Sequence, residues 1–338
     1  MMKPFFTVII PVYNRVNLLK LTLESLKRQT FENYEAFIID DGSTDGTKEI
    51  FGKYSDEKRW KFLVMEKNKG QAHCRNVAIK QSSGRFITFL DADDLWLPYR
   101  LERFYEKISK NEKAGFIFSN GYILRDGSIT GTFFKQTRKI PSGKLPAYMA
   151  ISDYWLPYVT TNIAFAREVL DKTGLFREDM SHLEDMELYT KILRYCETDF
   201  IPEPLSVYRI HSLTKNPASL TLKWDKGIED FLIAVDTASP SEKVKKELEE
   251  YVYYKQALVY MKNLQPEKAR EYLKKVMDIR PSAKIIFAYM VSFLPKFIML
   301  GLRFVYKITR RLRFSIISGD KFSDIKSWIK GIEDAAKN

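Results

Sequence analysis

Cysteine and histidine are both scarce in this chain of 338 residues, which has two cysteines and three histidines. Cys74 and Cys196 are too few for a disulfide framework and are typical of a protein in a reducing cytoplasm. The apolar run near the N-terminus is short, is interrupted by Pro11 and has no small-residue cleavage site, unlike a secretory signal peptide. We therefore expect a cytoplasmic protein.

Acidic residues are absent from residues 279–319, although the whole chain contains 43 of them. Eight Lys and Arg residues in this segment supply +8 of the net charge of +12, so the basicity of the chain is local. Within the segment, residues 285–306 form an apolar run whose only charges are Lys296 and Arg303. The length of this run is sufficient to span a membrane.

Three interpretations of the apolar run are open: a membrane span, a soluble packing helix, or short helices on a membrane surface. A charge such as Lys296 at the centre of a span costs roughly 2.5–3.5 kcal/mol, and Pro295 interrupts a helix there. We favour an amphipathic surface segment over about 280–318, with Lys and Arg facing the phosphates of an anionic membrane. Its aromatic residues do not alternate with basic ones, so we expect no nucleic-acid partner.

The first 120 residues alternate between strand and helix patterns, and the 45% hydrophobic content supports a substantial core. This alternation predicts an α/β fold with a doubly wound, mainly parallel sheet. Predicted strands lie at 5–12, 34–39, 61–65, 85–90 and 115–120. Later signals predict a hairpin turn at 125–128, strands at 160–166 and 205–211, a helix within 174–196, and an all-helical region from about 222.

Polar clusters follow three of the predicted strands: Tyr13-Asn14, Asp40-Asp41 and Asp91–Asp94. Ligands of parallel sheets bind beyond the carboxyl ends of the strands. Carboxylates spaced as in Asp91-Ala92-Asp93-Asp94 suit Mg²⁺ or Mn²⁺ that also holds a diphosphate. The alternative is that Asp93 or Asp94 caps a helix whose first turn contains Pro98. The Asp40-Asp41 cluster has a similar alternative, a simple turn and cap.

Five motifs occur in a fixed order in this sequence: TVIIPVYN, IIDDGSTDGT, NKGQAHCRN, FLDADDLWLP and HLEDMEL. Together they closely resemble the family 2 glycosyltransferases of bacterial surface-glycan assembly, which are inverting enzymes with the GT-A fold. The resemblance covers residues 5–212. It implies a GT-A domain over 1–220, with a nucleotide-binding half at 1–120 and an acceptor half at 121–220. A helical C-terminal region would occupy 221–338.

The resemblance also implies which residues bind the nucleotide-sugar donor. Tyr13 would lie against the base, and Asp41 would accept a hydrogen bond from the ring N–H of uracil or thymine. Arg75 would lie near the base and phosphates, and Asp91 would face the ribose. The same motifs contribute three further donor-binding residues: Pro11, Asn14 and Ala92.

The metal and catalytic roles follow from the resemblance in the same way. Asp93 would ligate Mn²⁺ or Mg²⁺, and His211 would complete the metal–diphosphate site. Asp185 would be the catalytic base. Glu184 would orient a neighbour or the acceptor, and Trp155 falls in the stretch expected to shape the acceptor side of the pocket.

We therefore predict a metal-dependent inverting glycosyltransferase, peripheral on the inner face of the cell membrane. It would transfer a sugar, with a UDP-sugar as the expected donor, to a hydroxyl of a glycan or lipid-linked glycan. Two alternatives remain: a catalytically silent sugar-nucleotide-binding or scaffold protein, and an enzyme that transfers one sugar to a polyprenyl phosphate.

Overall fold

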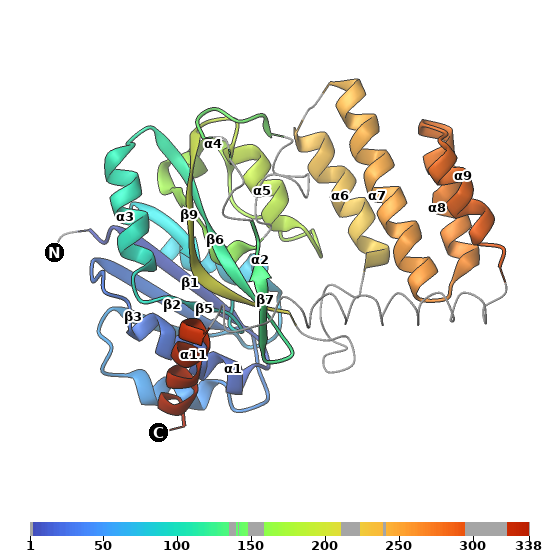
Figure 1. Ribbon diagram of the computed structural model, residues 1–338. Coiled ribbons are helices and arrows are strands. Elements are labelled where there is room, and N and C mark those ends of the chain that lie inside the picture. Colours follow the sequence, from blue (N-terminus) through green and yellow to red (C-terminus); the bar gives the residue numbers. More distant parts are fainter. Residues whose placement is uncertain are drawn as a thin grey trace.

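Figure 1 shows the computed structural model, which describes residues 3–134, 140, 142–147, 159–210, 224–238, 241–294 and 323–337. These residues form one nine-stranded sheet in the order β3-β2-β1-β4-β8-β6-β9-β5, with β7 paired to β6. The strands are β1 (Phe6–Val12), β2 (Tyr34–Asp40), β3 (Trp60–Val64), β4 (Phe86–Phe89), β5 (Leu95–Trp96), β6 (Ala114–Arg125), β7 (Ser128–Thr132), β8 (Ile163–Ala166) and β9 (Glu197–Ile210).

The sheet is mainly parallel, as the sequence predicts. Strand β1 pairs in parallel with β2 and β4, and β2 pairs in parallel with β3. Strand β8 runs antiparallel between β4 and β6, and the parallel order resumes from β6 to β9. Strand β8 is shorter than the predicted strand at 160–166, because Thr160–Asn162 forms a 3₁₀ turn, η3.

Helices cover both faces of the sheet. Alternate side chains of β1 (Phe6, Val8, Ile10) share a core with α1 (Val16–Lys27) and α3 (Arg100–Lys110). Ile9 points to the opposite face, where the core includes side chains of α2 (Gln71–Gln81) and α5 (Glu184–Ile192). This alternation follows from the two-residue period of a strand. It gives a layer of helices on each side of the sheet (Figure 1).

Several predicted details need correction. Helix α3 begins at Arg100, so Pro98 precedes the helix rather than lying in its first turn. No side chain caps α3, which removes the interpretation of Asp93 or Asp94 as its cap. In the alternating pattern of the first 120 residues, the segment between the second and third strands is a 3₁₀ helix, η1 (Lys48–Tyr54), rather than an α-helix. The hairpin turn between β6 and β7 is confirmed, because Arg125 pairs with Ser128.

A group of helices extends from the sheet domain (Figure 1): α6 (Trp224–Ala238), α7 (Glu242–Lys262), α8 (Pro266–Ile279) and α9 (Ala283–Val291). Helices α6 and α7 share a core with Met186 of α5, which ties this group to the sheet domain. The division predicted near residue 220 falls within 211–223, outside the described residues, so it stays a prediction. None of the described helices has the length and hydropathy that a membrane crossing requires.

The last helix, α11 (Ser323–Ala335), returns to the sheet domain instead of joining the other C-terminal helices (Figure 1). Its residues Ile325, Ile329 and Ile332 pack against side chains of β5, β6, β7 and β9. Strands β3 and β5 lie at opposite edges of the sheet, and α11 covers apolar side chains at the β5 edge. The remaining short elements are η4 (Arg167–Val169) and α4 (Leu170–Thr173).

Candidate active site

The polar clusters predicted at the strand ends do share one edge of the sheet, because β1, β2 and β4 are parallel and Val12 pairs with Asp40. Asn14 adopts a left-handed conformation with φ of 49°. Its side-chain oxygen accepts the N–H of Thr44 at 2.8 Å, and its own N–H donates to Ser43 Oγ at 2.8 Å. Asn14 therefore joins the loops that follow β1 and β2.

Two other residues of this motif, Pro11 and Tyr13, differ sharply in exposure. Pro11 is buried in β1 beside Ile39. The side chain of Tyr13 is 46% exposed at the end of the strand, where a base could lie against it.

Asp41 fastens the second motif to the loop before α2. The residue is 3% exposed, and its two carboxylate oxygens accept the N–H groups of Lys69 and Gly70 at 2.8 and 2.9 Å. The neighbouring Asp40 accepts the N–H of Ser43 at 3.0 Å, so the turn interpretation is correct for Asp40. The carboxylate of Asp41 is thus held rigidly at the edge of the sheet.

Arg75 lies at the centre of the site rather than at its surface. Its side chain is 2% exposed, and its guanidinium lies 5.5 Å from the centroids of both the Phe89 and the Phe176 ring, which contact each other edge to face. Arg75 Nη1 donates to Glu184 at 2.8 Å, and Nη2 donates to Asp91 at 3.3 Å. One buried cation therefore joins the DADD motif to the LEDM motif, which lie about 90 positions apart in the chain.

The carboxylates around Arg75 carry more negative charge than one guanidinium balances. Burial raises the pKa of Glu184 to about 7, with the charge of Asp185 acting in the same direction and Arg75 opposing both. Burial likewise raises the pKa of Asp91 to about 6; Arg75 opposes this shift, and the charges of Asp93 and Asp185 add to it. A divalent cation beside these carboxylates would relieve that repulsion.

Asp185 is held in a defined orientation in the first turn of α5. Its Oδ2 accepts a hydrogen bond from Thr160 Oγ1 at 2.9 Å, and its Oδ1 accepts the N–H of Met186 at 2.8 Å. Thr160 belongs to the turn η3, and no sequence signal marked it as a site residue. The contact could not be read from the sequence, because Thr160 and Asp185 meet only when β8 and α5 pack together.

A buried arginine supports the turn that carries Thr160. Arg100 is fully buried, and its Nη2 donates to the carbonyl oxygens of Thr161 and Ile163 at 3.1 and 3.2 Å. Its guanidinium lies 3.8 Å from the centroid of the Trp96 ring. Burial holds the pKa of Arg100 well below its usual range. These contacts fix the backbone on both sides of Asn162, at the end of the turn that carries Thr160.

The DADD motif is also tied to the end of β9. Asp94 is fully buried and accepts the backbone N–H of Arg209 at 2.8 Å, while Arg209 Nε donates to the carbonyl oxygen of Asp93 at 2.9 Å. Ala92 is buried between the two flanking carboxylates. His211 and Trp155 lie outside the described residues, and among those described no three His, Cys, Asp or Glu side chains form a ready metal cluster.

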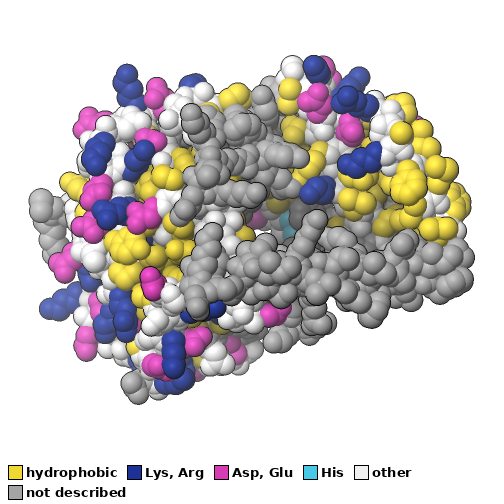
Figure 2. Space-filling model, viewed as in Figure 1, with side chains coloured by type: hydrophobic (Ala, Val, Ile, Leu, Met, Phe, Trp, Pro, Cys, Tyr) yellow, Lys and Arg dark blue, Asp and Glu magenta, His cyan; other side chains and the backbone are white. Residues whose placement is uncertain are grey.

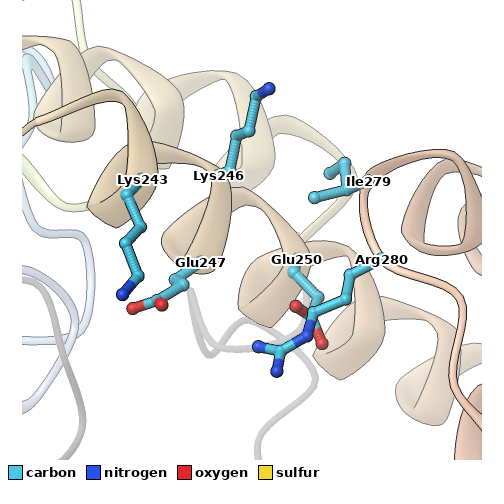
Figure 3. A pocket seen from close by; sticks show the side chains of 6 residues that line it. All are labelled: Lys243, Lys246, Glu247, Glu250, Ile279 and Arg280. Atoms are coloured by element: carbon cyan, nitrogen blue, oxygen red, sulfur yellow. The ribbon is translucent and has the colours of Figure 1, made fainter.

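A pocket in the helical region is distinct from this site. It lies between the N-terminal half of α7 and the end of α8 (Figure 3), and its lining includes three basic and two acidic side chains. These residues are Lys243, Lys246, Glu247, Glu250, Ile279 and Arg280. None of them belongs to the motifs at the sheet edge.

Comparison with known proteins agrees with this geometry. Residues 7–173 match the model of the family described as glycosyl transferase family 2. The UDP-Glc:alpha-D-GlcNAc-diphosphoundecaprenol beta-1,3-glucosyltransferase WfgD of Escherichia coli is 35% identical over 190 residues, which are 56% of this chain and 69% of that protein. The putative teichuronic acid biosynthesis glycosyltransferase TuaG of Bacillus subtilis is 34% identical over 127 residues, 37% of this chain and 50% of that protein.

Solved structures show the same fold at low sequence identity. Residues 1–349 of S. aureus TarS in complex with UDP-GlcNAc superpose with a TM-score of 0.59 and 18% identity, covering 83% of this chain and 82% of that one. The sheet, its polar edge and these similarities define a glycosyltransferase with the GT-A fold followed by helices. The chain belongs to glycosyl transferase family 2.

The close approach at Gly42 gives a stability prediction. Gly42 and Gly46 both have positive φ, 74° and 86°, so alanine at either position costs roughly 1–2 kcal/mol. Only at Gly42 would a Cβ lie 2.9 Å from the backbone of Lys67, whereas the nearest atom at Gly46 is a side-chain oxygen of Glu49 at 3.7 Å. We expect Gly42→Ala to cost about 1–3 kcal/mol more than Gly46→Ala. Urea unfolding of both variants measures the difference, and equal losses would contradict the proposed close packing.

The raised pKa of Glu184 gives a pH prediction. A buried carboxyl whose folded pKa is about 7 binds its proton more tightly in the folded state than in the unfolded state, where its pKa is about 4.5. This group therefore lowers the free energy of unfolding as pH rises from about 4.5 to 7. We expect Glu184→Gln to match the native chain at about pH 4 and to be more stable at about pH 8, without added metal. A native-like pH slope in urea unfolding of the variant would show that Glu184 is not the titrating group.

Proposed function

We propose that this enzyme transfers glucose from UDP-glucose, with inversion, to a hydroxyl of a lipid-linked glycan during surface-glycan assembly. The observation that carries the proposal is the Asp91–Arg75–Glu184 network, which places the donor motif next to the motif that contains Asp185. The choice of donor and acceptor is supported by the name of the Escherichia coli relative, which specifies UDP-Glc and a GlcNAc-diphosphoundecaprenol acceptor. An acceptor of that class would keep the enzyme at the cytoplasmic face of a membrane.

In the proposed reaction Asp185 acts as the general base. The acceptor hydroxyl loses its proton to Asp185 as its oxygen attacks the anomeric carbon of the sugar. The bond between that carbon and the diphosphate oxygen breaks, and UDP leaves with the bonding electron pair. Thr160 and the N–H of Met186 orient the Asp185 carboxylate, while Arg75 holds Glu184 and Asp91 in place.

We assign binding of the nucleotide-sugar donor to the residues at the carboxyl ends of β1, β2 and β4. Tyr13 and Asp41 would receive the uracil ring, with Pro11, Asn14 and Ala92 shaping the backbone around it. Asp91 would face the ribose. Because Arg75 is enclosed by two carboxylates and two rings, we assign it a positioning role for the donor site rather than direct contact with the base.

The possible ligand atoms at the sheet edge suit a divalent metal ion. Asp93 and His211 would hold Mn²⁺ or Mg²⁺, and hard oxygen ligands after a strand are appropriate for either ion. When bound, the ion would neutralise the charge that develops on the departing diphosphate. Burial raises the pKa of Asp91, and the nearby charges of Asp93 and Asp185 add to the shift, so a cation beside Asp91 would favour its ionised form.

Loss of the metal ligand should abolish transfer. We expect Asp93→Ala to retain the fold, since the residue is partly exposed, and to lose transfer from UDP-glucose in the presence of Mn²⁺. Asp171→Ala, which removes an exposed carboxylate from α4, is the matched control and should keep native activity. Release of UDP measures both variants. Unchanged turnover in Asp93→Ala, or full activity of the native enzyme in excess EDTA, would refute the metal assignment.

The base assignment predicts an order of damage at two adjacent carboxylates. Asp185→Asn can still accept the Met186 N–H and can donate to Thr160, so it should bind the donor normally. It cannot accept a proton, and we expect a loss of transfer of ~10²–10⁴-fold. Glu184→Gln should lose less. Transfer rates and donor affinities of both variants test the assignment. A larger loss of transfer in Glu184→Gln than in Asp185→Asn would identify Glu184 as the base.

Two experiments separate this proposal from its alternatives. A panel of UDP-, dTDP- and GDP-sugars, read by thermal shift and by nucleotide release, identifies the donor; binding without release or transfer would indicate a silent binding protein. Acceptors ending in a sugar or in a polyprenyl phosphate then distinguish glycan extension from transfer of a first sugar to the lipid.

A further inference from the structure

Helix α9 is apolar on two sides, and the described residues pack against only one of them. Ile285 is buried against Ala257 of α7 and against Leu273 and Val276 of α8. These contacts anchor the helix and determine which residues point away from the molecule. A helix that is apolar all round normally has a second partner for its other side.

The outer face of α9, which we define as Ile286, Phe287, Met290 and the following Phe293, is exposed. The four residues are 44%, 65%, 57% and 61% exposed. Their spacing places them on one side of a helix. They are four of the ten large hydrophobic residues that are exposed in the described part of the chain, and they fall within eight positions. Figure 2 shows hydrophobic side chains gathered at this end of the molecule.

Basic side chains lie near the two ends of this outer face. Arg280 and Lys284 are exposed at the start of α9. Lys284 lies 4.5 Å from the ring of Tyr254, and Arg270 lies 4.6 Å from the ring of Phe293. No acidic residue occurs between 279 and 319, and six further basic residues follow α9 in that stretch of sequence. An apolar face among cations complements a surface that is apolar inside and anionic at its boundary.

We propose that the outer face of α9 inserts into the boundary between headgroups and acyl chains of an anionic lipid bilayer. The helix lies along the membrane surface with Arg280 and Lys284 beside lipid phosphates, as amphipathic interfacial helices do. Ile285 and its neighbours on α7 and α8 hold the helix rigidly to the protein, so insertion of α9 would orient the whole enzyme. The inference deepens the proposed function, which requires an acceptor at a membrane, but its test does not depend on activity.

The test uses full-length protein, because truncation after α8 would also remove α11 and uncover the core beside Leu95 and Val207. Phe287→Ser combined with Met290→Ser removes the centre of the outer face. The matched control is Tyr195→Ser, which removes an exposed aromatic side chain from the sheet domain. Flotation with phosphatidylcholine–phosphatidylglycerol vesicles measures binding, with pure phosphatidylcholine vesicles as the comparison.

We expect the double variant to bind the anionic vesicles at least about tenfold more weakly than native protein, with Tyr195→Ser unchanged. Native binding should also be weaker to phosphatidylcholine and should decrease with salt. Native-like binding by the double variant, or equal loss in Tyr195→Ser, would overturn the proposal. A third result would also overturn it. If native protein does not bind vesicles but forms a concentration-dependent dimer, and the double variant does not form that dimer, the face is a protein interface.

A second pair of variants keeps the test decisive if the double variant fails to fold. Phe287→Trp retains the apolar surface, and its fluorescence should be quenched by vesicles containing brominated lipids, whereas Tyr195→Trp should not be quenched. Absence of quenching at Phe287→Trp would place α9 outside the bilayer. Binding of UDP-glucose should be native in all four variants, so a failure of the donor assignment is recognised separately.

Discussion

The buried Arg75 is the interaction on which the arrangement of the site depends. Its guanidinium packs against the rings of Phe89 and Phe176 and donates to Asp91 through Nη2 and to Glu184 through Nη1. A buried charge of this kind is costly unless all its partners are present, and removal of one partner leaves another unpaired. The network therefore couples the position of the DADD motif to the start of α5, and with it the position of Asp185.

Other parts of the site are also held by hydrogen bonds between segments that are distant in the sequence. Asp41 binds the loop before α2, Asp94 binds the end of β9, and Thr160 binds Asp185. Because each contact joins two segments at the carboxyl edge of the sheet, the candidate donor and catalytic residues form one rigid surface. That rigidity is what a reaction with an in-line geometry requires.

The helical region has a different relation to the sheet domain. Met186 of α5 lies in the core shared by α6 and α7, so the helix that carries Asp185 in its first turn also packs against the helical group. Helix α11 then returns to cover the β5 edge of the sheet. A membrane contact through α9 would consequently be transmitted to the site through packed helices rather than through a free linker.

The amino-acid sequence by itself determined the order of strands and helices in the first half, the mainly parallel sheet and the family, because hydrophobic period and motif order are local properties. Strand-end carboxylates stand out against apolar strands, which made Asp41, Asp91 and Asp93 candidate site residues, and the HLEDMEL motif made Asp185 a candidate through its resemblance to the family. Only the tertiary structure decided that Arg75 is enclosed, that Asp94 binds β9 rather than capping α3, and that Thr160 holds Asp185. The antiparallel insertion of β8 and the return of α11 were likewise beyond the sequence. Each of these depends on contacts between residues far apart in the chain, and no periodicity or spacing records which distant segments will meet.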